Sequence, residues 1–179
     1  MSQAGADKQL HARLGRVRLV VFDVDGVLTD GRIYLTAEGE EMKVFHARDG
    51  LGIRMLKRAG IEVAVISGRQ SKVVSQRMSA LDVTHVFQGR DDKLPLFREL
   101  LAELGVDCEQ AAYVGDDVID LPVMAEAGVA IAVADAHAAV RRVADWVTTT
   151  AGGYGAGREV CDAILEAGGH LEPGLRPGQ

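Results

Sequence analysis

The stretch VVFDVDGVLTDG, residues 20–31, sets two carboxylates one residue apart directly after an apolar run. The run at residues 17–22 is short, rich in β-branched residues and bounded by polar ones, which is typical of a buried strand. Its end would place Asp23 at the carboxyl edge of a sheet, where open parallel sheets bind ligands. Two acids this close repel each other, so the pair Asp23 and Asp25 indicates a metal ion or a shared proton. Taken alone, the pair fits equally well with acidic residues that cap a turn.

The composition limits the classes of protein to which the chain can belong. With 179 residues, 47% of them hydrophobic, we expect a single domain over residues 1–179 with its core at about 16–167. The formal net charge of −6 argues against nucleic-acid binding, which needs clustered Lys and Arg. No signal-like or membrane-length apolar run occurs, so we expect no membrane contact and a cytoplasmic location. Residues 1–14 and 168–179 lack a strong pattern and are expected to be flexible termini.

Short apolar runs alternate with amphipathic stretches between these termini. The alternation predicts an α/β fold, a three-layer Rossmann-like parallel sheet with helices on both faces. The predicted strands are residues 18–22, 62–66, 84–87, 111–114, 129–133 and 146–148. The predicted helices are residues 50–59, 71–81, 93–104, 119–127, 137–144 and 158–166.

One segment, residues 32–45, does not fit this alternation. Residues 32–35 and 41–45, joined by a short polar loop, have the pattern of a β-hairpin inserted after the first strand. Its apolar side chains are Ile33, Leu35, Met42 and Val44. Two strands alone are marginally stable, so these side chains need cover. Either another subunit supplies the cover, or the hairpin folds back on its own domain.

Polar residues follow the predicted strands at the points where they end. They are Asp23 and Asp25 after the first, Ser67 and Arg69 after the second, and Asp116 and Asp117 after the fourth, with Lys93 opening the helix after the third. Because parallel strands end at one edge of a sheet, these residues should form one site. A carboxylate nucleophile, a hydroxyl, an ammonium and further carboxylates suit phosphoryl transfer. Mg²⁺ suits such a set of oxygen ligands.

Four motifs in this order resemble those of the haloacid dehalogenase (HAD) superfamily. They are DVDGVLTD from Asp23, ISGR ending in Arg69, Lys93, and VGDDVID at residues 114–120. The resemblance implies that Asp23 is the nucleophile, which forms an aspartyl-phosphate, and that Asp25 is the general acid and base. It implies a Mg²⁺ ion held by Asp23, the main-chain carbonyl of Asp25 and Asp116. It also implies that Ser67 and Lys93 bind the phosphoryl oxygens.

The hairpin leaves no room for a separate cap domain between Asp23 and Asp49. Over about residues 17–166 the chain is similar to the capless, tetrameric HAD branch that hydrolyses 3-deoxy-D-manno-octulosonate 8-phosphate (KDO 8-phosphate) for lipopolysaccharide. The stretches DGRIYLTAEGEEMKVFHARDGLGIRML and GGYGAGREVCDAIL carry much of this likeness. The resemblance implies a phosphoric monoester hydrolase that acts on a sugar-acid phosphate and forms a homotetramer through its hairpins.

The same resemblance implies contacts with the substrate. The implied residues are Asp25, His46, Ala47, Arg48, Asp49, Gly50, Arg54, Gly68, Arg69, Arg77, Lys93 and Asp117. Arginines suit an acidic sugar phosphate, and Asp117 could accept hydrogen bonds from its hydroxyls. Arg54 and Arg77 lie on predicted helices, where solvated surface charges are the alternative. For His46 the alternative is a loop histidine with no special role.

Two further functions stay open. A nonulosonate 9-phosphate is the alternative substrate, although Arg48 favours the eight-carbon ester by resemblance. A non-catalytic oligomerisation or regulatory module is the alternative class, but such modules tend to lose the nucleophile or the lysine, and this chain keeps Asp23 and Lys93.

The glycine-rich stretch GGYGAGRE, residues 152–159, is not a dinucleotide-binding fingerprint, because Arg158 occupies the place of the third glycine. It is either a flexible loop whose Arg158 reaches a neighbouring subunit or a plain glycine-rich connection.

Overall fold

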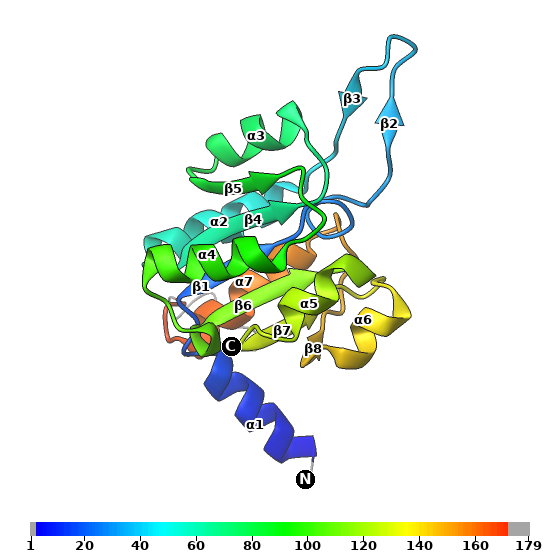
Figure 1. Cartoon of the computed structure of the whole chain (residues 1–179). Coiled ribbons are helices and arrows are strands. Elements are labelled where there is room, and N and C mark those ends of the chain that lie inside the picture. The colour runs from blue at the N-terminus through cyan, green and yellow to red at the C-terminus, as the bar shows by residue number, and fades with distance from the viewer. Residues whose placement is uncertain (1–2, 172–179) are drawn as a thin grey trace.

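The computed structural model describes residues 3–171, and a six-stranded parallel sheet lies at their centre (Figure 1). The strand order is β5-β4-β1-β6-β7-β8. The strands are β1 (Leu19–Phe22), β4 (Glu62–Ser67), β5 (His85–Gln88), β6 (Ala111–Gly115), β7 (Val129–Ala132) and β8 (Trp146–Val147). Each predicted strand overlaps an observed one, and the predicted parallel α/β sheet is confirmed.

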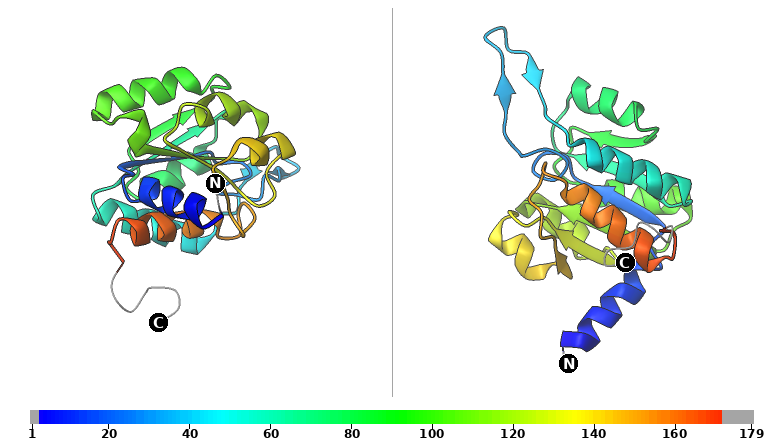
Figure 2. Two further views of the ribbon diagram at one scale, coloured as in Figure 1. Left: turned by 90° about the horizontal axis from the view of Figure 1, so that it is seen from below. Right: turned by 180° about the vertical axis from the view of Figure 1, so that it is seen from behind.

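Helices cover both faces of this sheet. The helices that the sequence predicts are observed as α2 (Ala47–Arg58), α3 (Lys72–Ser79), α4 (Leu94–Leu104), α5 (Leu121–Met124), α6 (Ala138–Val143) and α7 (Ala156–Ala167). Helices α2 and α7 pack against each other in front of the sheet in the view from behind (Figure 2), whereas α4 and α5 lie on the opposite face (Figure 1). Two short 3₁₀ helices, η1 (Cys108–Gln110) and η2 (Val118–Asp120), precede β6 and α5.

The central strand β1 is buried along its whole length. Its four apolar residues contact helices on both faces of the sheet, which explains why the sequence shows a continuous apolar run rather than an alternation. The core extends to Phe97 and Leu100 of α4 on one side and to Ile53 and Leu56 of α2 on the other, all at most 1% exposed. Burial of each such side chain contributes about 1.5–3 kcal/mol to folding.

The inserted hairpin consists of β2 (Tyr34–Leu35) and β3 (Glu41–Met42), and it projects away from the body of the protein (Figure 1). It does not fold back on its own domain, because its apolar side chains are 55–65% exposed: Ile33, Leu35, Met42 and Val44. Between β1 and α2 the chain forms only this hairpin, so no separate cap domain is inserted there.

The N-terminal segment contains a helix that the sequence pattern does not predict. Residues predicted to be flexible form helix α1 (Gln3–Leu14), which points away from the sheet (Figure 1). The sequence lacks a helical pattern there because few apolar residues of α1 face the core. Instead Arg13 anchors the helix: its guanidinium pairs with Asp145 at 2.7 Å and donates through Nε to the carbonyl of Gly128 at 2.9 Å.

At the other end, residues 172–179 of the predicted flexible tail lie outside the described residues. The amides of Gly168 and His170 donate to carbonyls of α7, and the side chain of Leu171 is buried. No helix of the part that the structure describes combines the length and the apolar character needed to cross a bilayer.

The glycine-rich stretch at residues 152–159 is a tight connection rather than a flexible loop. The amide of Gly153 donates to the carbonyl of Val27 at 2.9 Å, so this stretch packs against the loop that follows β1. A Cβ atom on Gly152 would collide with the carbonyl of Gly26. The side chain of Arg158 pairs with Asp162 at 2.7 Å on its own helix.

Replacement of Gly152 by alanine should therefore destabilise the protein by more than the same replacement at a glycine where a Cβ atom has room. Overpacking at a rigid backbone contact typically lowers the free energy of unfolding by about 1–3 kcal/mol. Gly60→Ala is the matched control, because Gly60 also lies in a turn, but a Cβ atom there would meet no atom within 4 Å, and only its φ of 77° opposes the substitution. Thermal unfolding should show the larger loss for Gly152→Ala; equal losses would contradict the tight contact.

Candidate active site

The ends of β1, β4 and β6 bring the predicted site residues together. Asp23 follows β1, Ser67 ends β4 and Asp116 follows β6. The register pairs Phe22 of β1 with residues of both neighbouring strands, so the strands end at the same level. An open pocket of about 250 Å³ lies above them. Its polar lining is Asp23, Asp25, Ser67, Arg69, Asp91, Asp116 and Asp117.

Lys93 lies buried beneath this pocket, immediately before α4. Its Nζ is 2.8 Å from Oδ2 of Asp23 and 2.7 Å from Oδ1 of Asp120. Burial has the largest effect on Lys93 and lowers its pKa, but attraction by the two carboxylates outweighs it, so the pKa lies above the ordinary value. Because a buried ammonium is tolerated only when it is paired, Lys93 fixes the carboxylate of Asp23 in place.

Asp120 is a site residue that the sequence reasoning missed. It is fully buried, and the hydroxyl of Tyr113 donates to its Oδ1 at 2.7 Å. Its Oδ2 accepts the main-chain N–H groups of Asp116 at 2.9 Å and Asp117 at 3.2 Å. Asp120 thus holds both Lys93 and the turn that carries Asp116. The sequence does contain a signal for Asp120, because it is the last residue of the motif VGDDVID. The resemblance assigns roles only to Asp116 and Asp117 of this motif.

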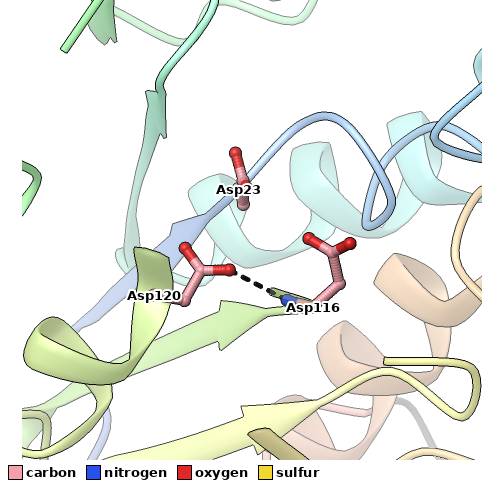
Figure 3. A group of neighbouring side chains, drawn as sticks. All are labelled: Asp23, Asp116 and Asp120. Atoms are coloured by element: carbon pink, nitrogen blue, oxygen red, sulfur yellow. Dashed lines mark hydrogen bonds between the residues drawn. The ribbon is translucent and has the colours of Figure 1, made fainter. Parts of the chain in front are cut away.

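Three carboxylates of this site can face one cation. Asp23, Asp116 and Asp120 offer oxygens that lie within 4.8 Å of one another, and Figure 3 shows them converging from the ends of β1 and β6 and from η2. Oδ1 of Asp116 is buried and has no hydrogen-bond partner among the described residues. Gly26 approaches so closely that a Cβ there would collide with the Asp116 carboxylate. This donor set fits Mg²⁺, which prefers oxygen ligands.

Two of the residues predicted to bind the metal through their side chains lie in this carboxylate cluster. Asp23 and Asp116 belong to the carboxylate cluster, whereas both oxygens of Asp120 are already hydrogen-bonded. Asp23 is engaged too, because its Oδ1 accepts the main-chain N–H of Val24 at 2.6 Å and its Oδ2 pairs with Lys93. Asp116 is therefore the freest ligand of the three. The side chain of Asp25 is not part of the cluster, and ligation through its main-chain carbonyl stays a prediction.

The pKa values of two acids in this site are raised above their ordinary values. Burial is the main cause that raises the pKa of Asp23 to about 7, although Lys93 lowers it. Burial also raises the pKa of Asp116 to about 8, and repulsion by Asp23 and Asp120 adds to the effect. Without a divalent cation the site therefore holds protons near neutral pH, and a cation would displace them.

The side chain of Asp25 faces the base of the hairpin, which the sequence reasoning did not anticipate. Its Oδ1 forms an ion pair with Lys43, whose Nζ also lies 3.4 Å from Glu41. Arg69 pairs with Glu41 at 3.0 Å, and its Nε is 4.0 Å from Oδ2 of Asp25. The sequence pattern places Lys43 and Glu41 only in the hairpin, because polar residues that alternate with apolar ones normally face solvent.

The predicted substrate contacts divide into two groups. Asp25, Gly68, Arg69 and Asp117 line the pocket, and Lys93 lies beside Asp23 beneath it. The other predicted contacts lie outside the pocket of this chain: His46, Ala47, Arg48, Asp49, Gly50, Arg54 and Arg77. Asp91 lines the pocket and was missed, although it stands only two residues before Lys93.

Several residues of the second group have structural partners. Oδ1 of Asp49 accepts the main-chain N–H of Arg158 at 2.8 Å, which caps the first turn of α7. Arg54 donates to the carbonyl of Ala80 at 2.8 Å, and the guanidinium of Arg77 lies over an aromatic ring. Nδ1 of His46 accepts an N–H of the first turn of α2. Their contact with a substrate stays a prediction.

The fold and the site define a class of enzyme. The arrangement is that of a HAD-like hydrolase: a parallel sheet with Asp23 and Asp25 after its central strand, a buried lysine and a second acidic turn. The sequence model of the haloacid dehalogenase-like hydrolases matches residues 85–156. The chain belongs to the family of 3-deoxy-D-manno-octulosonate 8-phosphate phosphatases. The phosphatase KdsC of Escherichia coli is 48% identical to it over 96% of both chains, and that of Yersinia pestis is 51% identical over 89% of this chain and 86% of its own.

Solved structures agree with this membership. The crystal structure of 3-deoxy-D-manno-octulosonate 8-phosphate phosphatase from Yersinia pestis has a TM-score of 0.90 at 50% identity, and the match covers 92% of this chain and 89% of the other. The enzyme from Moraxella catarrhalis, solved in complex with a magnesium ion, a phosphate ion and KDO, has a TM-score of 0.88 at 42% identity over 89% of this chain and 92% of its own.

Mg²⁺ should bind the metal-free protein more tightly at pH 8 than at pH 6. With pKa values of about 7 and about 8, Asp23 and Asp116 hold protons at pH 6 that the cation must displace, and they hold fewer at pH 8. We expect the apparent affinity to rise by at least about tenfold over this range, with protons released on binding. Titration calorimetry in two buffers of different ionisation enthalpy measures both quantities. A constant affinity without proton release would contradict the raised pKa values.

Proposed function

We propose that the protein is a Mg²⁺-dependent phosphatase that hydrolyses KDO 8-phosphate to the free sugar acid and phosphate in lipopolysaccharide biosynthesis. The observation that carries the proposal is the buried pair of Asp23 and Lys93, 2.8 Å apart, at the floor of a pocket bordered by further carboxylates. The relative from Escherichia coli, which is 48% identical over 96% of the chain, is named a KDO 8-phosphate phosphatase, and this supports the substrate. The Moraxella catarrhalis complex with magnesium, phosphate and KDO supports it too.

The first half of the proposed reaction transfers the phosphoryl group to the protein. The carboxylate of Asp23 attacks phosphorus, the bond between phosphorus and the sugar oxygen breaks, and Asp25 gives its proton to that oxygen. Lys93 holds Asp23 in place, and Lys93 and Ser67 bind the phosphoryl oxygens. A Mg²⁺ ion held by Asp23, Asp116 and the main-chain carbonyl of Asp25 would neutralise charge on the phosphoryl group.

The second half releases phosphate. Asp25, now a carboxylate, takes a proton from a water molecule that attacks phosphorus, and the bond to Asp23 breaks. Arg69, whose side chain is 46% exposed at the pocket rim, is suited to the carboxylate of the sugar acid. The exposed Asp117 is suited to sugar hydroxyls.

The hairpin supports a proposal about assembly. Four apolar side chains that are 55–65% exposed on one projecting element need a partner surface, and another copy of the chain can supply it. We infer a homotetramer that associates through these hairpins. The expected cytoplasmic location, which depends on the sequence pattern alone, stays a prediction.

The substrate proposal is tested by phosphate release from three esters with and without Mg²⁺. KDO 8-phosphate should give a kcat/KM at least about tenfold above that of a nonulosonate 9-phosphate and of a hexose phosphate, because one misplaced group in a specific site costs about this much. Turnover should require Mg²⁺. A higher kcat/KM for the nonulosonate ester would overturn the substrate, and no turnover of any ester would favour the regulatory module.

The assembly is tested by the double substitution Leu35→Asp and Met42→Asp. If the hairpins associate through these side chains, buried charges should dissociate the oligomer, because an unpaired buried charge is strongly unfavourable. Glu38→Gln is the matched control, since Glu38 is exposed in the hairpin turn. Light scattering measures the mass of each variant, and a double variant that keeps the wild-type mass would refute the hairpin interface.

A further inference from the structure

We propose that Lys43 is a positioning residue for the reaction: it holds one carboxylate oxygen of Asp25 and leaves the other oxygen without a hydrogen-bond partner, available for proton transfer. The base of the hairpin is then part of the active site and not only an element of assembly. The inference rests on the proposed function, in which Asp25 is the general acid and base.

The burial of Lys43 is the first observation. It follows β3 between Met42 and Val44, which are 56% and 55% exposed, yet its own side chain is only 3% exposed. A buried ammonium is strongly unfavourable unless it is paired with acids. Its partners are the carboxylates of Asp25 and Glu41. The hairpin therefore exposes the two apolar neighbours of Lys43 and turns this cation inward, towards the loop that follows β1.

The two oxygens of Asp25 are the second observation, because they have different surroundings. Oδ1 forms the ion pair with Lys43. Oδ2 is buried without a hydrogen-bond partner among the described residues, and the Nε of Arg69 lies 4.0 Å from it. Asp25 lines the pocket, and because Lys43 holds Oδ1, Oδ2 is the oxygen left to exchange a proton with substrate. A carboxylate fixed through one oxygen presents the other in a defined direction, which favours proton transfer.

A second layer of contacts holds Lys43 itself. Glu41 lies 3.4 Å from Lys43 and 3.0 Å from Arg69, so it bridges the two cations. Arg69 follows Ser67 at the end of β4. The resulting ring joins the loop after β1, the hairpin and the loop after β4. Lys43 does not itself line the pocket, which indicates that it acts through Asp25 rather than by binding substrate.

The variant Lys43→Met tests this role with two esters. The sugar oxygen of KDO 8-phosphate needs a proton to leave, whereas the p-nitrophenolate of p-nitrophenyl phosphate leaves without one. We expect the kcat for KDO 8-phosphate to fall by about 100-fold, which is the usual scale of general acid catalysis, with a KM within about threefold of wild type. With p-nitrophenyl phosphate, the first turnover should stay fast and the second half-reaction should slow, which gives a burst of p-nitrophenolate.

Two variants serve as controls. Lys43→Arg keeps a cation on a long side chain and should restore most of the lost kcat. Arg32→Met removes another cation of the hairpin, but its side chain is 71% exposed and pairs with Asp30 at 3.7 Å, outside the site, so its kinetics should match wild type. Light scattering on each variant separates these effects from a change of assembly.

Each other outcome has a definite meaning. A kcat for Lys43→Met within about threefold of wild type would overturn the positioning role, as would an equal loss with both esters and no burst. A raised KM with unchanged kcat would overturn it in favour of a direct substrate contact. Failure of the wild-type protein to hydrolyse either ester would instead overturn the proposed function.

Discussion

The site depends on one buried ammonium. Lys93 lies between Asp23 and Asp120, and its burial is favourable only because both carboxylates pair with it. The pairing positions the attacking carboxylate from below, and through Asp120 it also positions the turn that carries Asp116. The strand ends, the helix start and the acidic turn are therefore fixed to one another by a single set of ion pairs. Removal of Lys93 would leave both buried carboxylates without their shared cation.

A second set of charges organises the opposite side of the pocket. Asp25 pairs with Lys43, and Glu41 connects Lys43 to Arg69. The two carboxylates at the end of β1 thus have separate cations: Asp23 contacts the one beneath the sheet edge, and Asp25 contacts the one in the hairpin. This separation suits two different tasks, because the nucleophile and the acid and base are each held by a different element of the fold. The glycine pair at residues 152–153 supports the loop that follows Asp25 by close backbone packing.

Much of this arrangement could be predicted from the sequence. The alternation of apolar runs and amphipathic stretches indicated all six strands, and motif order placed Asp23, Ser67, Lys93 and Asp116 at one edge. The rest depends on contacts between distant residues, which local pattern does not encode. Helix α1 lacks a helical pattern because a large part of its anchoring is the pairing of Arg13 with Asp145, 132 residues away. Lys43 has the spacing of a solvent-facing residue, and only the folded chain turns it towards Asp25.

Rapid-quench trapping tests most directly whether the carboxylate held by Lys93 attacks phosphorus. Protein mixed with Mg²⁺ and KDO 8-phosphate labelled with ³²P is quenched in acid within the first turnover, and the labelled peptide is identified. We expect the label on the peptide that contains Asp23, and it should form and disappear at rates consistent with turnover. The Asp23→Asn variant should carry no label. A label on another residue, or full turnover by Asp23→Asn, would contradict attack by this carboxylate.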